Sequence, residues 1–343
     1  MQQITNEQNS FETFKGYLTR ANVLEETVSL FKNFAQLDSD MFNFIIDNYL
    51  NEDNNIFTCK YSEILKIKKF LDKNTAYKKL RSEYRALSKK EKDNSTGILH
   101  AFHEIMQFFE SRYDNYEQSK MLYDVFHDLD IRACPYCNLN SIDTVITDDD
   151  RNKSKKKKKI SSENKITRAT CDHFLPKSEY PFFSISYYNL IPSCSDCNSS
   201  LKKDNIELTP VNPFHENFDT LAHFEVFYKT QKLKTAEIDN EDNLDILIIN
   251  DTNKDYINEH CELFKLYNRY KTKKYHVASL LTKIDFFQKE TNDIINRLDI
   301  PKYSNQDSIK KMLFDYFLEE NSINRYPLMK LTRDLLKQFD IIN

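Results

Sequence analysis

Four cysteines form two pairs that could hold a metal ion. Cys134 and Cys137 stand in CPYC, and Cys194 and Cys197 stand in CSDC, so each pair is a C-x2-C knuckle. A knuckle places two thiolates on one tight turn, and four thiolates complete the closed shell of a structural zinc site. A single C-x2-C can also be redox-active, but two knuckles favour zinc. We therefore predict a zinc ion that stabilises the fold and leaves no open position for water.

Residues that could hydrolyse a phosphodiester lie between and after the knuckles. Asp172 and His173 are adjacent, Asn189 follows further along the chain, and Asn198 comes directly after Cys197. A histidine can accept a proton from water near neutral pH. Carboxylate and amide oxygens suit Mg²⁺ or Mn²⁺. A base, a hard cation and nearby positive charge are what phosphodiester hydrolysis needs.

The order C-x2-C, DH, N and C-x2-C-N, with the strings DHFLPKS and NLIPSC, resembles the HNH endonuclease family. The pattern is most similar to its four-cysteine zinc branch and to the nuclease subunits of Septu-type and retron-associated antiphage systems. The resemblance covers about residues 131–215. It implies a ββα-metal core in which His173 is the general base, Asp172 and Asn198 hold Mg²⁺ or Mn²⁺, and Asn189 orients the loop and the histidine ring.

The same resemblance implies the substrate and the partner. The expected activity is endonucleolytic cleavage of DNA, with RNA left open as the alternative substrate, in bacterial antiphage defence beside a separate ATPase subunit. Two other interpretations stay open. One is a zinc-knuckle module that binds DNA or a protein without cleaving anything, and the other is a restriction enzyme for modified DNA.

Lysines around the motif are candidate phosphate contacts. Between Arg151 and Lys177 there are ten Lys or Arg against two acids, and an insert of about residues 148–166 contains most of them. Such a loop would bind phosphates, or it would be a solvated lysine loop. The family's lysine three residues after the last Asn is Leu201 here, and Lys202 follows about 100° further round an α-helix. The predicted contacts are Lys155, Lys157, Lys177, Lys202 and Lys203.

The composition excludes several functions. The net charge is -4 and only two glycines occur, where an average chain of 343 residues has about 24. No Rossmann or Walker phosphate loop and no G-x-S-x-G elbow is possible. The chain is therefore not expected to bind nucleotide itself, which suits an effector with a separate ATPase.

The pattern of apolar residues predicts an α+β protein of three parts. Residues 1–125 read as helices that serve as scaffold or partner-docking region, 126–215 as the nuclease core, and 216–343 as short strands followed by helices. Strands are expected at 223–228, 233–238 and 244–249, and one long helix at 262–287. No apolar run is long enough for a transmembrane helix and no secretory signal opens the sequence, so a reducing cytoplasm is expected. The oligomeric state is not indicated.

Overall fold

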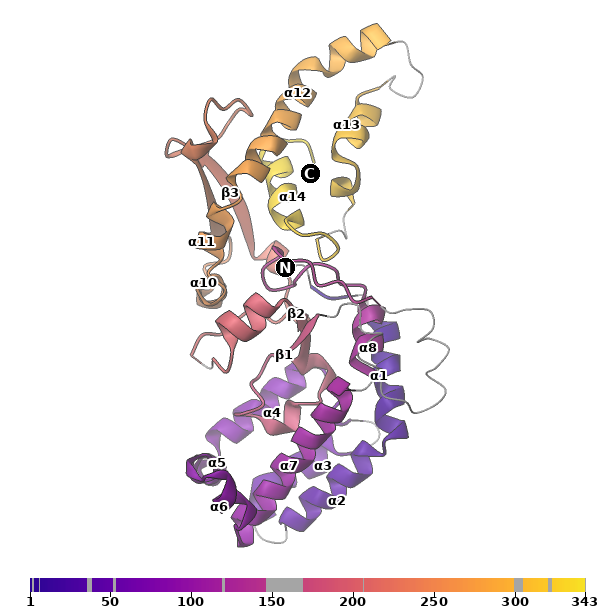
Figure 1. Cartoon of the computed structure of the whole chain (residues 1–343), viewed down its shortest axis with the longest axis vertical. Coiled ribbons are helices and arrows are strands. Elements are labelled where there is room, and N and C mark those ends of the chain that lie inside the picture. Colours follow the sequence, from indigo (N-terminus) through magenta and orange to yellow (C-terminus); the bar gives the residue numbers. More distant parts are fainter. Residues whose placement is uncertain are drawn as a thin grey trace.

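The computed structural model describes residues 1, 3–5, 7–35, 39–51, 54–118, 121–145, 169–205, 207–298, 305–319 and 323–342. This part of the chain mixes helices with two small antiparallel sheets, as the α+β prediction requires. The N-terminal helices lie at one end of the molecule, the C-terminal elements lie at the other, and β1 and β2 lie between them (Figure 1).

The N-terminal helices bury apolar stripes of helical spacing. In α1, Ser10, Phe14 and Leu18 recur every four residues and face inward. Asn74 caps α5 by accepting a hydrogen bond from the backbone N–H of Tyr77. The helices are α1 (Gln8–Arg20), α2 (Val23–Ala35), α3 (Ser39–Tyr49), α4 (Tyr61–Lys73), α5 (Thr75–Ala86), α6 (Lys89–Asp93), α7 (Gly97–Gln118) and α8 (Met121–Leu129).

A short pair of strands and a helix form the middle of the molecule. Strands β1 (Thr170–His173) and β2 (Leu190–Ser193) pair antiparallel, with His173 opposite Leu190. The segment that joins them contains the 3₁₀ turns η2 (Pro181–Phe183) and η3 (Tyr187–Asn189). The π-helix η4 (Asp196–Lys202) follows β2 directly. The order is therefore strand, strand, helix.

The N-terminal helices enclose the segment that joins β1 to β2. The ring of Phe182 is fully buried, with ring centroids 5.6 Å from Phe31, 5.9 Å from Tyr77 and 5.9 Å from Phe109. The backbone of the segment bonds to the same part of the chain, because the N–H of Tyr187 donates to the carbonyl of Phe57 at 2.8 Å. The segment is irregular, so the N-terminal part of the chain supplies hydrogen-bond partners for backbone groups that would otherwise pair within a sheet.

The C-terminal part contains a second sheet and further helices. Its strands pair in the order β4-β3-β5, and Asp334 of the last helix accepts a hydrogen bond of 2.7 Å from the backbone N–H of Phe224 in β3. The remaining elements are the 3₁₀ turns η5 (Phe218–Thr220), η6 (Glu241–Asn243) and η8 (Asp315–Leu318), the strands β3 (Ala222–Tyr228), β4 (Gln231–Lys232) and β5 (Leu244–Asn250), and the helices α10 (Asp255–Leu263), α11 (Leu266–Lys271), α12 (Lys274–Leu298), α13 (Gln306–Phe314) and α14 (Met329–Gln338).

Two predicted elements differ from the structure. The expected strand at 233–238 is not formed, and the strand that pairs with the end of β3 is only the two residues of β4. The expected long helix at 262–287 is divided into the end of α10, α11 and the first half of α12. Lys265 has a left-handed backbone with φ of 51°, which stops the helix there and turns α11 toward the cysteine knuckles.

Phe182→Ala tests the role of the N-terminal helices as a scaffold for the β1–β2 segment. Removing this fully buried ring should lower the free energy of unfolding by about 3–5 kcal/mol, because the cavity cannot close around three other rings. Urea unfolding measures the change. Phe286→Ala is the matched control, since Phe286 is 39% exposed and should cost far less. Equal losses for the two variants would contradict the scaffold role.

Candidate functional site

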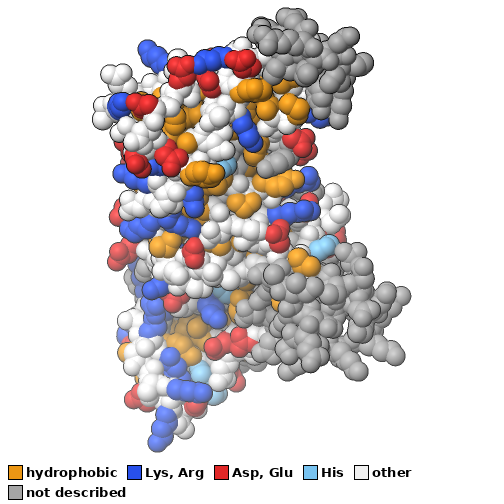
Figure 2. Space-filling view, turned by 45° about the horizontal axis from the view of Figure 1, so that its top comes forward, with side chains coloured by type: hydrophobic (Ala, Val, Ile, Leu, Met, Phe, Trp, Pro, Cys, Tyr) orange, Lys and Arg blue, Asp and Glu red, His pale blue; other side chains and the backbone are white. Residues whose placement is uncertain are grey.

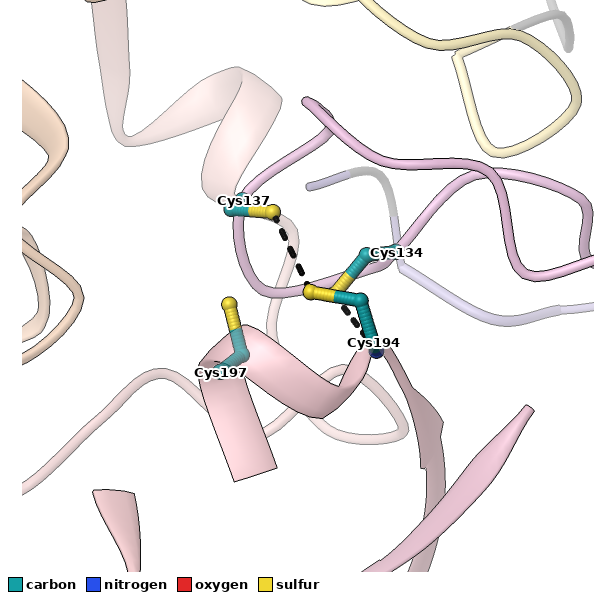
Figure 3. A group of neighbouring side chains, drawn as sticks. All are labelled: Cys134, Cys137, Cys194 and Cys197. Atoms are coloured by element: carbon teal, nitrogen blue, oxygen red, sulfur yellow. Dashed lines mark hydrogen bonds between the residues drawn. The ribbon is translucent and has the colours of Figure 1, made fainter. Parts of the chain in front are cut away.

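The four knuckle cysteines converge on one centre (Figure 3). Their sulfur atoms all lie within 4.8 Å of one another, and the sulfurs of Cys137 and Cys194 are 3.9 Å apart. Tetrahedral zinc with Zn–S bonds of about 2.3 Å requires sulfur separations of about 3.8 Å. All four side chains are buried. The donor set therefore fits one zinc ion, held by Cys134, Cys137, Cys194 and Cys197.

Different elements bring the two knuckles together. The first is a turn in which the N–H of Asn138 donates to the carbonyl of Cys134 at 2.7 Å, and Asn138 has a left-handed φ of 52°. The side chain of Asn138 is fully buried and bonds to the backbone of Ile323, Tyr326 and Lys330. In the second knuckle, Cys194 directly follows β2 and Cys197 lies in the first turn of η4. The C-terminal segment thus fixes one knuckle and β2 fixes the other.

Arg269 of α11 supplies positive charge to the cysteine cluster. Its guanidinium donates to the sulfur of Cys197 at 3.4 Å and to the sulfur of Cys137 at 3.7 Å. Four thiolates and Zn²⁺ together carry two negative charges, so a nearby guanidinium offsets part of that charge. The other cysteines (Cys59, Cys171 and Cys261) are also buried, and they do not belong to this cluster.

Tyr136, which lies inside the first knuckle, connects the cysteine cluster to the Asp172-His173 pair. Its hydroxyl donates to Oδ2 of Asp172 at 2.6 Å. Its ring stacks on Phe264 with centroids 4.6 Å apart, and its carbonyl accepts a 2.9 Å hydrogen bond from Nε2 of His260. Nδ1 of His260 accepts from the N–H of Val211, and burial lowers the pKa of this histidine to about 3. His260 is therefore a neutral structural link behind the knuckle.

The structure differs from the prediction at Lys202. Instead of facing solvent as a phosphate contact, its ammonium is buried, 3.0 Å from Oδ1 of Asp172 and 2.7 Å from the carbonyl of His173. The cause is the π-helical turn, in which the N–H of Lys203 donates to the carbonyl of Asn198. A π-helix holds one more residue per hydrogen-bonded turn, so Lys202 takes about the position that residue 201 would have in an α-helix.

Asp172 is consequently closed to a cation in this structure. The residue is 2% exposed, and its two carboxylate oxygens bond to Tyr136 and Lys202. Burial raises the pKa of this carboxyl, although Lys202 and Tyr136 act in the opposite direction. The predicted Mg²⁺ or Mn²⁺ ligand pair of Asp172 and Asn198 therefore does not fit a divalent cation as it stands, because Lys202 provides the counter-charge.

The two asparagines of the motif lie where they brace the strands. Nδ2 of Asn198 donates to the carbonyl of Cys171 at 3.2 Å, which fastens η4 to β1. Asn189 is fully buried and bonds to both backbone groups of Leu175 and to the carbonyl of Phe183. Asn189 therefore orients the loop, but the histidine ring is held by another group.

His173 presents one ring nitrogen at the end of β1. Nε2 lies 3.0 Å from the carbonyl of Ser184, which can only accept, so Nε2 carries the proton and Nδ1 carries the lone pair. The ring of Tyr113 from α7 lies 4.5 Å away. Burial lowers the pKa of His173 to about 3, with the carbonyl of Ser184 opposing and Lys177 and Lys202 adding to the shift. The neutral ring has the lone pair that a general base needs, but a pKa this far below neutrality makes it a weaker base than a histidine with its usual pKa.

The other candidate phosphate contacts fall into two groups. Lys177 is exposed, and its ammonium lies 4.9 Å from the centre of the Tyr113 ring that covers His173. Lys203 is also exposed, directly after η4. Lys155 and Lys157, with the rest of the basic insert, lie outside the described residues.

Comparisons with known proteins show no family for this chain. No family model matches it, and no solved structure matches it. Among curated proteins it is similar to Protein ea31 of Escherichia phage lambda, with 37% identity over 60 residues. That stretch is 18% of this chain and 19% of the phage protein, so the chain spans about a fifth of this relative's length. In the described residues, no helix combines the length and apolar character needed to cross a membrane.

Four residues at the site were not found from the sequence. Tyr136 carried a signal, because its position inside a C-x2-C turn places it beside the metal centre. Arg269, Tyr113 and His260 carried none, because each reaches the site from a helix distant in the chain.

The cysteine cluster predicts one zinc ion per purified chain. Cys194→Ser should lose most of the bound zinc and unfold at a lower temperature, because zinc binding contributes directly to the free energy of folding. Elemental analysis and thermal melting measure these effects. Cys59→Ser is the matched control, since Cys59 is a buried cysteine outside the cluster. Full zinc content in Cys194→Ser would contradict the four-cysteine site.

The Asp172–Lys202 ion pair predicts a competition between Lys202 and divalent cations. Lys202→Met should lower the free energy of unfolding by about 3–5 kcal/mol, because it leaves a buried carboxylate without its counter-charge. Mn²⁺ should restore part of this stability at pH 8, and it should not stabilise the wild type through Asp172. Thermal melting with and without Mn²⁺ measures both effects, and Lys203→Met is the exposed control. Stabilisation of the wild type by Mn²⁺ that Asp172→Asn abolishes would contradict the competition.

Proposed function

We propose that this chain is an HNH-type endonuclease that hydrolyses DNA, with His173 as the general base. The observation that carries the proposal is the state of His173. His173 ends strand β1, and its Nε2 is held by the Ser184 carbonyl, so that Nδ1 carries the lone pair. The order strand, strand, helix beside a four-cysteine cluster supports the proposal, because the resembling family has the same order of elements and motifs.

His173 takes the proton of the attacking water in this proposal. The bond forms between the water oxygen and phosphorus, and the bond to the 3′ oxygen of the preceding nucleotide breaks. The leaving 3′ oxygen takes a proton from solvent water, which leaves a 5′-phosphate and a 3′-hydroxyl. Nδ1 receives the proton while the Ser184 carbonyl keeps the ring in one orientation. Lys177, exposed beside Tyr113, adds positive charge for the phosphate.

Mg²⁺ or Mn²⁺ is the cofactor that the resemblance implies for this reaction. In this conformation Asp172 has no free oxygen for it. We therefore propose cation dependence as a property to be measured and assign no step of the reaction to the cation.

A second function has its own supporting observation. A non-cleaving zinc module that binds DNA or a protein needs the cysteine cluster and the Asp172–Lys202 pair only as structural elements, and the buried ion pair suits that role. In the enzyme proposal, the antiphage role and the ATPase partner follow from the resemblance alone.

Plasmid cleavage by the zinc-loaded chain distinguishes the two functions. Cleavage is assayed without added metal, with Mg²⁺ and with Mn²⁺, for the wild type and His173→Ala. We expect His173→Ala to reduce the rate by roughly 10²–10⁴-fold, the usual contribution of a positioned general base. His100→Ala is the matched control, since the His100 side chain is 49% exposed on α7.

Each result has a clear meaning. Cleavage that is abolished in His173→Ala and kept in His100→Ala supports the enzyme. Equal cleavage by the wild type and His173→Ala would contradict the role of His173. No cleavage by the wild type with any metal would favour the zinc module.

A further inference from the structure

Helices α4, α5 and α6 carry strong positive charge in a chain that is negative overall. Residues 60–93 contain twelve Lys or Arg against five Asp or Glu, a net charge of +7, whereas the whole chain has a net charge of -4. The other residues together therefore carry -11. Local charge of this size, opposite in sign to the rest of the molecule, attracts polyanions to one region of the surface.

All five acids of this region already have a partner. Each lies within 4.0 Å of a nitrogen inside the region or on an adjacent helix, and three of the five pair with a lysine of the region. The pairs are Glu63 with Lys66 (2.7 Å), Asp72 with Lys68 (2.6 Å), Glu83 with Lys79 (3.9 Å), Asp93 with His103 (3.3 Å), and Glu91 with the backbone N–H of Ser88 (2.7 Å).

Within helices α4, α5 and α6 themselves, five exposed lysines are left without an ion pair. Lys69 and Lys73 are one turn apart on α4, Lys78 follows on α5, and Lys89 and Lys90 begin α6. In the described part of the chain, none of the five comes within 4.0 Å of a carboxylate oxygen. We call these five the α4–α6 surface. Lys and Arg side chains are visible at the lower left of Figure 2, the end where α5 and α6 lie.

The α4–α6 surface is fixed to the segment that follows His173. The ring of Tyr61, which begins α4, is 5.3 Å from the ring of Phe174, the residue after His173. The hydroxyl of Tyr180 donates to Asp72 of α4 at 2.7 Å. Arg81 of α5 is 3.0 Å from a carboxylate oxygen of Glu179, which is 3% exposed. These contacts hold the lysines in a set position relative to the candidate base.

We propose that the α4–α6 surface binds the sugar-phosphate backbone of the nucleic acid on which His173 acts. The choice of nucleic acid as the partner rests on the proposed function. The surface holds the polyanion independently of base sequence, so its contribution to binding depends on salt. This inference gives the N-terminal helices a second role besides enclosing the β1–β2 segment.

Charge reversal within and outside the surface tests the proposal. Fluorescence anisotropy of a labelled duplex DNA is measured with the zinc-loaded full chain, without divalent cation, over a salt series. Lys69→Glu/Lys73→Glu/Lys78→Glu should weaken binding by about tenfold or more, and should reduce the slope of log K against log salt by roughly 0.9 for each phosphate that is no longer neutralised. The control triple Lys234→Glu/Lys271→Glu/Lys311→Glu makes the same change of net charge at exposed C-terminal lysines and should leave affinity within about twofold.

The outcomes separate this proposal from the nuclease proposal. Equal weakening by the two triples would overturn the α4–α6 surface, because net charge alone would then explain binding. Absence of binding by the wild type to duplex DNA and to RNA of the same sequence would also overturn it. Binding through this surface without cleavage would instead contradict the nuclease proposal and support the α4–α6 surface. Cleavage by the wild type, together with unchanged DNA affinity in the α4–α6 triple variant, would support the nuclease proposal and contradict the α4–α6 surface.

Discussion

The closure of two cysteine knuckles onto one centre is the constraint on which the rest of the structure depends. A long stretch of chain separates Cys137 from Cys194, so bringing the knuckles together costs chain entropy that grows with the length of the loop. Zinc held by the four thiolates would contribute on the order of 10–16 kcal/mol, which exceeds that cost. Once closed, the centre fixes the end of β2 through Cys194 and the start of η4 through Cys197. Tyr136 then carries the constraint from the first knuckle to Asp172 in β1.

The segment between β1 and β2 explains why a small strand pair needs so many surrounding helices. Two such short strands cannot bury an apolar face alone. Here the connecting segment contributes Phe182 to a cluster of rings from α2, α5 and α7. The buried side chain of Asn189 forms hydrogen bonds with backbone groups of the same segment. The N–H of Tyr187 and the hydroxyl of Ser186 bond to the chain between α3 and α4. The position of the His173 ring, through Ser184, therefore depends on helices from the N-terminal part of the chain.

The local features could be predicted from the sequence, and the long-range ones could not. The spacing of Cys134, Cys137, Cys194 and Cys197 was enough to predict the cluster of four buried cysteines that could hold a zinc ion, since thiolate pairs on tight turns have few other arrangements. The expected strands at 223–228 and 244–249 are confirmed, because alternating apolar residues report the burial of one sheet face. The periodicity of apolar residues over 262–287 indicated a single helix. The helix is broken because Lys265 adopts a left-handed backbone, which the periodicity does not reveal. Arg269 reaches the cysteines only because of that break, so its role had no local signal.

The lysines show most clearly why residue type alone is an incomplete guide. In the sequence, Lys202 and Lys177 are both candidate phosphate contacts near one motif. The π-helical turn of η4 directs Lys202 inward, where it neutralises Asp172 in a buried pair that salt screens only weakly. Lys177 stays exposed beside Tyr113, and its charge is available to a phosphate. One extra residue in the turn of η4 therefore makes Lys202 the counter-charge of Asp172 instead of a contact for the substrate. Attraction of a polyanion then depends on exposed lysines elsewhere on the surface.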